Sequence, residues 1–497
     1  MLAHNTWELV PLPKGQKWVG SKWVFKIKEN VDGSVEWYKV RIVAQGFSQK
    51  PHLDYTETFA PVAKFASLRT ILAIAAIEDM ELHHMDVSSA FLNGDLEEDI
   101  YMAQPEGFVE PGQEHLVCRL KKSLYGLKQS PRQWYQKLHE TFTSMGFKRC
   151  PSDNSIWVWA KDKVKVIIPV YVDDLTLACN NLTSLNELKS QLKAKFEMRD
   201  LGELNYILGL EIRRDRSKQK IYLSQRKHTL DILRRFNHEH SRPLSTPLDH
   251  NITLSKVEDM SQEEQDYMSS IPYLSAVGSL MYLAIGTRPD IAFAVGLLSR
   301  FNSCPAKVHW NAIQHVFKYL KGTVDLGLEF GPSASGGVVS SVFSDSDYAG
   351  DTEKARSTSG YATFIGASCV NWSSRRQATV AKSTTEAELI AANAGASDGT
   401  WMSHLLEELG YPQSSAFPLY MDNQSTIKVA RNPEHHGKMK HIDTKYYWIR
   451  DQVDSGHLKI NWVPSGGNCA DIFTKALSNE LHQQQCSLLG LRKLELD

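Results

Sequence analysis

Residues 164–179 read V-K-V-I-I-P-V-Y-V-D-D-L-T-L-A-C, and this stretch has the clearest pattern in the chain. Apolar residues alternate from Val164 to Val172, Asp173 and Asp174 interrupt them, and a second apolar run follows. A period of two is typical of a β-strand, and an acidic pair between two such runs predicts a tight hairpin turn. An isolated Asp-Asp pair is most often only a turn, because Asp favours turns. Here hydrophobic strands flank the pair on both sides, which favours a functional interpretation.

A second strand-end carboxylate lies upstream, in H-H-M-D-V-S-S-A-F over residues 83–91. Asp86 lies near the end of a predicted strand over Glu81–Val87. Like charges brought together are costly unless a cation neutralises them. Asp86, Asp173 and Asp174 therefore predict a centre for two Mg²⁺ ions, which would clamp the attacking and leaving oxygens of a phosphoryl transfer.

The C-terminal part of the chain carries a second acidic set in a distinctive order. Its members are Asp345, Glu388, Asp422 and Asp471. Two of them end predicted strands, Glu388 projects from an early turn of a predicted helix, and Asp471 lies at a predicted helix start, where the helix dipole favours an anion. Four converging acids can hold two Mg²⁺ ions for hydrolysis of a phosphodiester. Asp347 and Glu386 are the nearby alternatives to Asp345 and Glu388.

Length and composition set broad limits. The chain has 497 residues, 42% of them hydrophobic and 23% charged, which indicates folded protein and two to four domains. The 56 Lys and Arg nearly cancel the 57 Asp and Glu, so net charge identifies no partner. Seven scattered cysteines without a C-x-x-C pair argue against a disulfide framework or a cysteine zinc site. With no signal-peptide pattern and no long apolar run, we expect an intracellular soluble protein.

The hydrophobic pattern also predicts the order of elements. A hairpin over residues 18–45 would turn at Asp32-Gly33, helices are predicted over 67–77, 273–300 and 308–320, and an amphipathic helix is predicted over 182–196. A further helix is predicted within 120–145, after Gly126 and with Pro131 near its start. Residues 221–233 read as a strand that leads into a helix. Polar or Gly/Ser-rich segments over 241–264 and 331–341 are predicted linkers.

Several longer strings resemble one family. They are N-T-W-E-L-V-P-L-P-K-G (5–15), T-F-A-P-V-A-K (58–64), S-L-Y-G-L-K-Q-S-P-R-Q-W (123–134) and T-R-P-D-I (287–291). With Y-V-D-D, their order resembles the Pol polyprotein of copia-type LTR retrotransposons, from about Asn5 to Leu477. The resemblance implies an α+β multidomain chain: a right-hand polymerase with fingers, thumb and an antiparallel palm sheet, followed by a mixed α/β ribonuclease H-like domain. We expect the polymerase in residues 1–240, a connector with flexible linkers in 241–340, the ribonuclease H-like domain in 341–480 and a tail in 481–497.

The resemblance also implies roles for individual residues of the polymerase. Asp86 and Asp173 would be the main metal ligands, and Asp174 would be more structural. Phe91 matches the steric gate that excludes a ribose 2′-OH, although a core phenylalanine is the plain alternative. The remaining matches are Lys39 and Arg41 for the incoming triphosphate, and Tyr125 and Gly126 for the loop that contacts nucleotide and template. Exposed strand charges are usually only solvated, and Lys39 could be one of these.

For the second acidic set, the resemblance is to a ribonuclease H domain. The mobile His–Gly loop of many such enzymes is not evident, and Val463–Asn468 occupies its place. His435, His436 and His441 lie in a basic segment that we interpret as contacting hybrid backbone, since their spacing matches no zinc site. Basic runs over 9–28 and 115–139, interleaved with aromatic residues such as Trp134 and Tyr135, predict a nucleic-acid surface.

The sequence therefore predicts an RNA-directed DNA polymerase with ribonuclease H activity, dependent on Mg²⁺ or Mn²⁺. The expected partners are RNA template, DNA primer, RNA/DNA hybrid and deoxynucleoside triphosphates, with the Gag-type shell and integrase of the same element, and no membrane. The expected location is the cytoplasm, including virus-like particles, with access to the nucleus. A catalytically silent relic that only binds nucleic acid is the alternative hypothesis.

Overall fold

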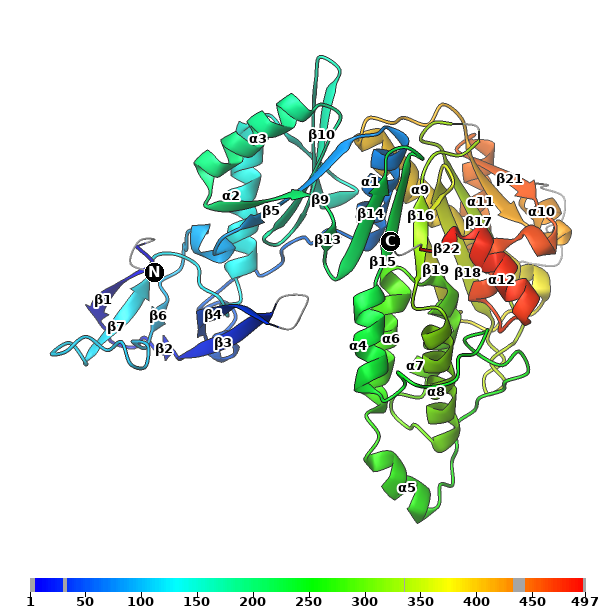
Figure 1. Ribbon diagram of the computed structural model, residues 1–497, viewed down its shortest axis with the longest axis horizontal. Helices are drawn as coiled ribbons and strands as arrows, with labels where there is room; N and C mark the ends of the chain where they lie inside the picture. Colours follow the sequence, from blue (N-terminus) through cyan, green and yellow to red (C-terminus); the bar gives the residue numbers. More distant parts are fainter. Residues whose placement is uncertain (1–4, 30–33, 335, 432–442, 495–497) are drawn as a thin grey trace. The chain divides into compact units, whose positions relative to one another are not determined.

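The chain folds into two compact units, each of which is described by itself (Figure 1). The structure is a computed structural model, and it describes residues 5–29, 34–334, 336–431 and 443–494. The first unit is Met1–Ala63 with Glu81–Glu203, and the second is Lys64–Met80 with Leu204–Asp497. The chain thus leaves the first unit at residue 64, returns to it at residue 81 and leaves it again at residue 204. Both units combine helices and sheets, as the predicted α+β class requires.

An antiparallel six-stranded sheet forms the centre of the first unit. Its order is β12 (Met198–Glu203), β5 (Glu81–Val87), β11 (Asp174–Cys179), β10 (Val164–Tyr171), β9 (Asp153–Lys161) and β8 (Lys148–Cys150). Helices α2 (Ser130–Ser144) and α3 (Leu182–Lys195) pack onto one face through Trp134, Phe142 and Leu188. The alternating pattern of residues 164–179 supplies that face, with Val166, Ile168, Val170, Leu175 and Leu177 all buried. The hairpin predicted there is confirmed.

Local sequence signals fix the ends of these helices. Pro131 lies in the first turn of α2, where a missing N–H costs nothing. Asn181 caps α3 by accepting a hydrogen bond from the Ser184 N–H at 2.9 Å, and Lys193 and Lys195 lie in the last turn, where the helix dipole favours cations. Both helices share one hydrophobic core with the same face of the sheet.

Two smaller sheets complete the first unit. One has the order β1 (Trp7–Pro11), β7 (Leu116–Leu120), β6 (Tyr101–Met102) and β2 (Trp18–Val19), and the other is the hairpin of β3 (Ser21–Glu29) and β4 (Val35–Ala44). Short 3-10 turns, η2 (Gly46–Ser48) and η3 (Ala90–Asn93), follow β4 and β5. The predicted Asp32-Gly33 turn lies outside the described residues. Trp37, Lys39 and Arg41 share one face of β4 because successive residues of a strand point to opposite sides.

The second unit contains a helical core beside a five-stranded antiparallel sheet. The sheet has the order β13 (Tyr206–Ile207), β14 (Leu210–Asp215), β15 (Lys220–Ser224), β16 (Leu326–Phe330) and β22 (Leu491–Lys493). The helices are α4 (Arg226–Arg235), α5 (Gln262–Ser269), α6 (Tyr273–Gly286), α7 (Ala292–Ser299) and α8 (Lys307–Gly322), with the turn η4 (Pro289–Ile291) between α6 and α7. The segment expected as a C-terminal tail forms α12 (Asn479–Leu488) and β22, and β22 pairs with β16.

A second five-stranded sheet of this unit is mixed. Its order is β19 (Ser368–Arg376), β18 (Thr358–Ile365), β17 (Ser340–Ser346), β20 (Phe417–Met421) and β21 (Leu458–Trp462). The first three strands are antiparallel, whereas β20 runs parallel to both β17 and β21. The remaining elements are α9 (Thr384–Glu408), α10 (Gln424–Arg431), α11 (Asp443–Asp454) and the 3-10 turns η6 (Ser465–Gly467) and η7 (Cys469–Phe473). Ala392 and Ala396 of α9 pack against Val342 and Leu419 of the sheet.

Helix α1 (Phe65–Ile77) belongs to the second unit although its neighbours in sequence belong to the first. Its residues 66–76 are all buried, as expected for a helix that is apolar on every side. Arg69 is the one charged residue in this buried stretch. Its guanidinium donates to the carbonyls of Val370 (2.7 Å), Ile285 (2.6 Å) and Gly286 (2.9 Å). Burial lowers the pKa of Arg69 to about 9. The carbonyls and the Trp372 ring, 4.0 Å away, compensate the buried charge.

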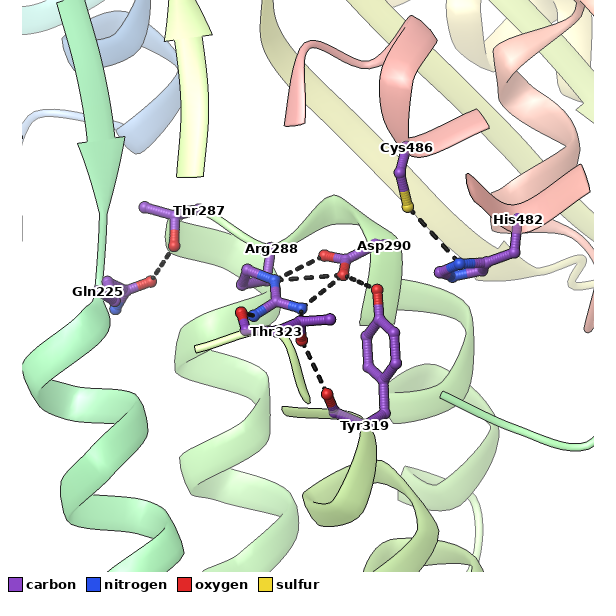
Figure 2. Close-up of polar contacts among 8 residues, drawn as sticks. All are labelled: Gln225, Thr287, Arg288, Asp290, Tyr319, Thr323, His482 and Cys486. Atoms are coloured by element: carbon purple, nitrogen blue, oxygen red, sulfur yellow. Dashed lines mark hydrogen bonds and ion pairs between the residues drawn. The ribbon is translucent and has the colours of Figure 1, made fainter. Parts of the chain in front are cut away.

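The T-R-P-D-I string of the sequence forms a buried polar network at η4 (Figure 2). Nη2 of Arg288 lies 2.7 Å from Oδ2 of Asp290, and the Tyr319 hydroxyl donates to the same carboxylate at 2.6 Å. Arg288 also donates to the Thr323 carbonyl at 3.0 Å. His482 of α12 lies at the edge of this network, 3.6 Å from Cys486 and with its ring edge-on to Tyr319. The ion pair is thereby hydrogen-bonded on both sides, which a buried charge requires.

Within the described residues, no single helix has the length and apolarity needed to cross a bilayer. The bent pair α5 and α6, with 54° between them, passes that test only jointly, by length and composition. The division of the chain by function into polymerase, connector and ribonuclease H-like regions stays a prediction, since the two units group residues by packing alone.

Candidate functional site

The turn between β10 and β11 carries the acidic pair and has an unusual backbone. Val172 has φ of +61°, a left-handed conformation that is costly for a β-branched residue. The buried Trp134 holds this turn from below, because its indole N–H donates to the Val172 carbonyl at 2.7 Å. The strained turn therefore presents Asp173 in a fixed position.

The adjacent strand brings the third carboxylate to the same place. Asp86 of β5 is the register partner of Asp174 on β11, and the Val87 N–H donates to the Asp173 carbonyl at 2.9 Å. All three acids predicted from the sequence thus lie together at one edge of the sheet. Burial, followed by the charge of Asp174, raises the pKa of Asp86 above its usual range. Burial likewise raises the pKa of Asp173.

Lys39 and Arg41 of β4 line a cavity of about 470 Å³ that Asp86 and Asp173 also line, and their contact with a triphosphate stays a prediction. The electrostatic attraction of Lys39 acts on both carboxylates and opposes the rise of their pKa values. The cavity has a third cation, Arg199 of β12, which is the register partner of Asp86. Lys39 and Arg199 both lie over the Trp37 ring, 5.3 Å and 5.4 Å from its centroid. The cavity therefore combines three carboxylates, Asp86, Asp173 and Glu197, with three cations, which suits a ligand carrying phosphates and a metal ion.

An aromatic pair forms another part of this site. The rings of Phe91 and Tyr125 are 4.9 Å apart, and the Arg41 guanidinium lies 5.3 Å from the Tyr125 centroid. Gly126 has φ of +94°, and a Cβ there would lie 2.1 Å from the Ala44 carbonyl oxygen. Only glycine lets this loop approach β4 so closely, and the Ala44 N–H in turn donates to the Tyr125 carbonyl at 2.8 Å. Gly126 thus positions Tyr125 beside Arg41.

The basic run over 115–139 does not form the open cationic surface that we expected. Most of its cations are ion-paired with carboxylates of the same unit. The pairs are Arg119 with Asp99 and Glu8, Lys121 with Glu8, Lys122 and Lys137 with Asp95, and Arg132 with Glu57. Trp134 is buried in the core rather than free to stack on bases, and the Tyr135 hydroxyl donates to the Asn154 carbonyl at 2.9 Å. The stacking role expected for Trp134 is therefore wrong, whereas nucleic-acid binding by these partly exposed cations stays a prediction.

The second acidic set meets at the edge of the mixed sheet. One carboxylate oxygen each of Asp345, Glu388 and Asp422 lies within 4.8 Å of the other two. Asp345 is on β17, Glu388 is on α9 and Asp422 directly follows β20. Asp471 of η7 joins this group electrostatically, since the charge of Asp345 contributes to raising its pKa. All four predicted acids therefore come together.

The electrostatics of this centre favour a bound cation. Burial, followed by the charges of Asp345 and Asp422, raises the pKa of Glu388 to about 9. Burial, followed by the charge of Asp345, raises the pKa of Asp471 to about 7. Oε2 of Glu388 and Oδ1 of Asp471 are buried without a hydrogen-bond partner among the described residues. Hard oxygen ligands left without donors are what a divalent cation such as Mg²⁺ would satisfy.

The geometry also distinguishes Asp345 and Glu388 from their nearby alternatives, Asp347 and Glu386. Glu386 caps α9, because its carboxylate accepts the Lys382 N–H at 2.8 Å and its own N–H donates to Ser383 at 3.1 Å. The carboxylate of Asp347 accepts the Thr358 N–H and lines a different cavity. Of the four candidate acids Asp345, Asp347, Glu386 and Glu388, only Asp345 and Glu388 belong to the cluster with Asp422.

The segment in place of the His–Gly loop is ordered. The amide of Asn468 donates to the Ser344 carbonyl at 3.0 Å, and its Oδ1 accepts the Ala470 N–H at 3.2 Å. The side chain thus ties this segment to the strand that carries Asp345. His435, His436 and His441 lie outside the described residues.

Sequence reasoning missed several contacts of the two centres. Arg199 joins the first through strand pairing, which no local motif announces. The string H-H-M-D-V gave no role for His84, yet its Nε2 lies 2.8 Å from Oδ1 of Asp174. At the second centre, the Thr474 hydroxyl donates to the Asp345 carboxylate, and Nζ of Lys475 lies 3.2 Å from Oδ2 of Asp471. The four-residue spacing of Asp471 and Lys475 could have predicted the last pair.

Comparisons with known proteins agree with the resemblance seen in the motifs. The family described as reverse transcriptase (RNA-dependent DNA polymerase) matches residues 4–250. The retrovirus-related Pol polyprotein from transposon TNT 1-94 of Nicotiana tabacum is 42% identical over 490 residues, which are 98% of this chain and 37% of that polyprotein. A putative transposon Ty5-1 protein of Saccharomyces cerevisiae is 32% identical over 310 residues, which are 62% of this chain and 98% of that protein.

Among solved structures, the foamy viral protease-reverse transcriptase in complex with an RNA/DNA hybrid aligns with a TM-score of 0.46 and 11% identity, covering 86% of this chain and 49% of that chain. The chain spans only 37% of the length of the tobacco polyprotein. Its match nevertheless extends over almost all of the present sequence. The chain belongs to the copia-type family of retrotransposon Pol polyproteins and contains the reverse transcriptase domain of that family.

Proposed function

We propose that this chain copies RNA into DNA at the centre of Asp86 and Asp173 and cleaves the RNA strand of RNA/DNA hybrids at the centre of Asp345, Glu388, Asp422 and Asp471. The observation that carries the first half is the shared cavity of about 470 Å³, in which both polymerase carboxylates face Lys39, Arg41 and Arg199. A site for nucleotide addition needs metal-binding acids on one side and cations for the triphosphate on the other.

In this proposal the chain's own residues position the reactants. Asp86 and Asp173 would hold the metal ions, while Asp174 supports the turn. Bound Mg²⁺, or Mn²⁺ in its place, would draw together the attacking primer 3′-hydroxyl and the α-phosphate and stabilise the leaving pyrophosphate. Lys39 and Arg41 would grip the triphosphate, Arg41 through the planar fork that matches phosphate oxygens.

The aromatic pair would select the sugar. Phe91 lies against Tyr125, and Gly126 fixes the loop that carries Tyr125. A ring held in this way cannot turn aside to accept a ribose 2′-hydroxyl, which supports the steric-gate role proposed for Phe91. Phe91 also packs at the edge of the core of the first unit, so the alternative of a core phenylalanine stands beside the steric-gate role.

The second half of the proposal rests on the donor set at the mixed sheet. Three clustered carboxylates, two buried oxygens without donors and a neighbouring lysine match a site that binds metal and a phosphodiester. The sheet order β19-β18-β17-β20-β21, with β20 parallel to β17, supports a ribonuclease H-like architecture. Placing Asp345 and Asp422 at the ends of adjacent parallel strands brings them together for this chemistry.

The substrates and partners follow from the same proposal. The chain would use an RNA template, a DNA primer, deoxynucleoside triphosphates and RNA/DNA hybrid, and it would act with the Gag-type shell and integrase of its element. Its place of action would be the cytoplasm, within virus-like particles, with later access to the nucleus.

Primer extension by the purified chain on a poly(rA)–oligo(dT) hybrid, with and without Mg²⁺, tests the polymerase. Asp173→Asn should abolish synthesis and leave hybrid cleavage intact, whereas Asp422→Asn should do the reverse. A mutant that kept its targeted activity would refute that site. Hybrid binding without any incorporation or cleavage by the wild-type chain would instead favour the relic hypothesis.

A further inference from the structure

A second cavity of the C-terminal unit, about 350 Å³ in volume, lies next to the second acidic centre. The two share a wall. Thr474 and Lys475 line the cavity, and the same two residues contact Asp345 and Asp471. Other parts of the wall come from α7, from the loop between β17 and β18, and from residues 250–256. A ligand in this cavity would therefore lie one side chain away from the metal-binding carboxylates.

The lining of this cavity carries more cations than free carboxylates. The cations are Lys256, Arg300, Lys354, Arg376 and Lys475, and the acids are Asp347, Asp351 and Glu353. Each acid already has a partner within the lining. Asp347 accepts the Thr358 N–H, Glu353 accepts the Lys256 N–H, and Asp351 lies 2.7 Å from Nη1 of Arg376.

Arg300 forms no ion pair with a described residue, whereas Arg376 and Lys475 pair with Asp351 and Asp471. The charges of Asp351, Asp347 and Glu353 act on Arg300 from further away. The single hydrogen bond of Arg300 among the described residues goes to the Thr358 hydroxyl at 3.4 Å, and no carboxylate lies within ion-pair distance. Burial, followed by the charge of Arg376, lowers the pKa of Arg300. Arg300 and Arg376 line the same cavity and the charge of Arg376 disfavours the Arg300 cation, so an anion in the cavity would favour both guanidinium groups.

We propose that this cavity binds a backbone phosphate of the RNA/DNA hybrid, adjacent to the phosphodiester at the acidic centre, with Arg300 as its main ligand. This inference rests on the proposed hydrolytic function. A planar guanidinium matches the oxygens of a phosphate, and Arg376 and Lys354 supply further positive charge. Phe293 and Leu297 of α7 give the cavity an apolar side, on which a sugar can rest. Because Arg300 follows α7, the helical part of the unit would help to set where the strand is cut.

Neutral methylphosphonate linkages, placed one at a time in each strand of a short hybrid, locate the phosphate that enters the cavity. In the full chain, one or two positions near the cleavage site should raise the KM for cleavage about 10- to 100-fold, as expected for loss of a charged hydrogen bond. Arg300→Gln should raise the KM by a similar factor on the unmodified hybrid and should no longer respond to those positions. It should also reduce the salt dependence of KM by about one unit of slope.

Lys354→Gln provides a second variant on an exposed residue, in case Arg300→Gln does not fold, and it should lower the same sensitivity partially. Arg492→Gln, in the same unit but lining another cavity, is the matched control and should behave as the wild type. Normal cleavage with the same methylphosphonate profile in the wild type and in both cavity variants would overturn the inference and leave the proposed function standing. Absence of cleavage by the wild-type chain would overturn both.

Discussion

Nε2 of His84 lies 2.8 Å from Oδ1 of Asp174, and this contact distinguishes the two aspartates of the acidic turn. Asp173 lines the cavity with Asp86, whereas Asp174 does not line it and is held by the histidine from the neighbouring strand. The difference supports the prediction that Asp174 is structural. In metal sites, such supporting contacts orient the ligands and tune their affinity.

Replacing His84 should therefore weaken metal binding at the polymerase centre without removing a ligand. We expect His84→Leu to raise the Mg²⁺ concentration needed for half-maximal primer extension by about 10- to 100-fold. His84→Gln, which keeps a hydrogen-bond donor, should have a smaller effect. Titration of Mg²⁺ in the extension assay measures both. Equal Mg²⁺ dependence in His84→Leu and the wild type would show that Asp174 needs no support.

Arg199 should act on the incoming nucleotide. It lines the cavity beside Asp86 and lies over Trp37, so we expect Arg199→Ala to raise the KM for dTTP about tenfold with a smaller change in kcat. Lys195→Ala, an exposed cation at the end of α3, is the control and should leave the KM unchanged. A fall in kcat alone would assign Arg199 to the reacting atoms rather than to the triphosphate.

The buried carboxyl of Glu388 should make the stability of the metal-free chain depend on pH. Its pKa rises from 4.5 to about 9, first because of burial and then because of Asp345. A group whose folded pKa is raised stabilises the fold below its unfolded pKa, and this contribution is lost as the pH approaches the folded value. In EDTA, we expect the unfolding temperature to fall from about pH 5 to about pH 9 more steeply in the wild type than in Glu388→Gln.

Mg²⁺ should reverse this loss, because the cation needs the ionised carboxylate and would bind more tightly as the pH rises. Thermal unfolding at several pH values, with EDTA or with Mg²⁺, gives both results. Parallel pH profiles of the wild type and Glu388→Gln in EDTA would contradict the assignment of a buried, protonated Glu388.

Removing one partner of the buried pair of Arg288 and Asp290 should strongly lower the free energy of unfolding. Asp290→Ala leaves the Arg288 charge buried, and we expect the free energy of unfolding to fall by about 3–5 kcal/mol. Tyr319→Phe removes one hydrogen bond to the carboxylate and should cost about 1.5–3 kcal/mol. Denaturant unfolding measures both changes. The exposed pair of Arg234 and Asp231 is the control, where Arg234→Ala should cost less than about 1 kcal/mol.

Local patterns of the sequence were sufficient for the elements that carry the carboxylates proposed to be catalytic. Strand β5 has the predicted bounds Glu81–Val87, and the hairpin over residues 164–179 turns at Asp173 as the alternation predicted. Both follow from the local alternation of apolar residues, although β5 pairs with strands that lie far away in sequence. The acids of each set could therefore be assigned, and strand pairing then brings them together.

Features that depend on distant partners were not accessible in this way. The basic run over 115–139 gave no sign that Glu8, Glu57 and Asp95 would neutralise it. Likewise, the apolar spacing over 67–77 predicted a helix but not that Arg69 would end among the carbonyls of Val370 and Gly286, some 300 and 200 residues away in sequence. Composition within a segment does not reveal partners outside it.

Because helix α1 packs in the second unit but lies between two segments of the first in sequence, no single cut of the chain separates the two units. The reverse transcriptase family match ends at residue 250, yet α1 and residues 204–250 fold with the unit that also contains the second acidic centre. A recombination or a stop codon after residue 250 would preserve every polymerase motif. It would nevertheless remove much of the protein that packs around α1, whose residues 66–76 are buried. Decay of an insertion from its 3′ end would accordingly leave α1 without its packing partners long before the Y-V-D-D codons were touched, and copies that look intact over their first half would already encode an incompletely packed chain.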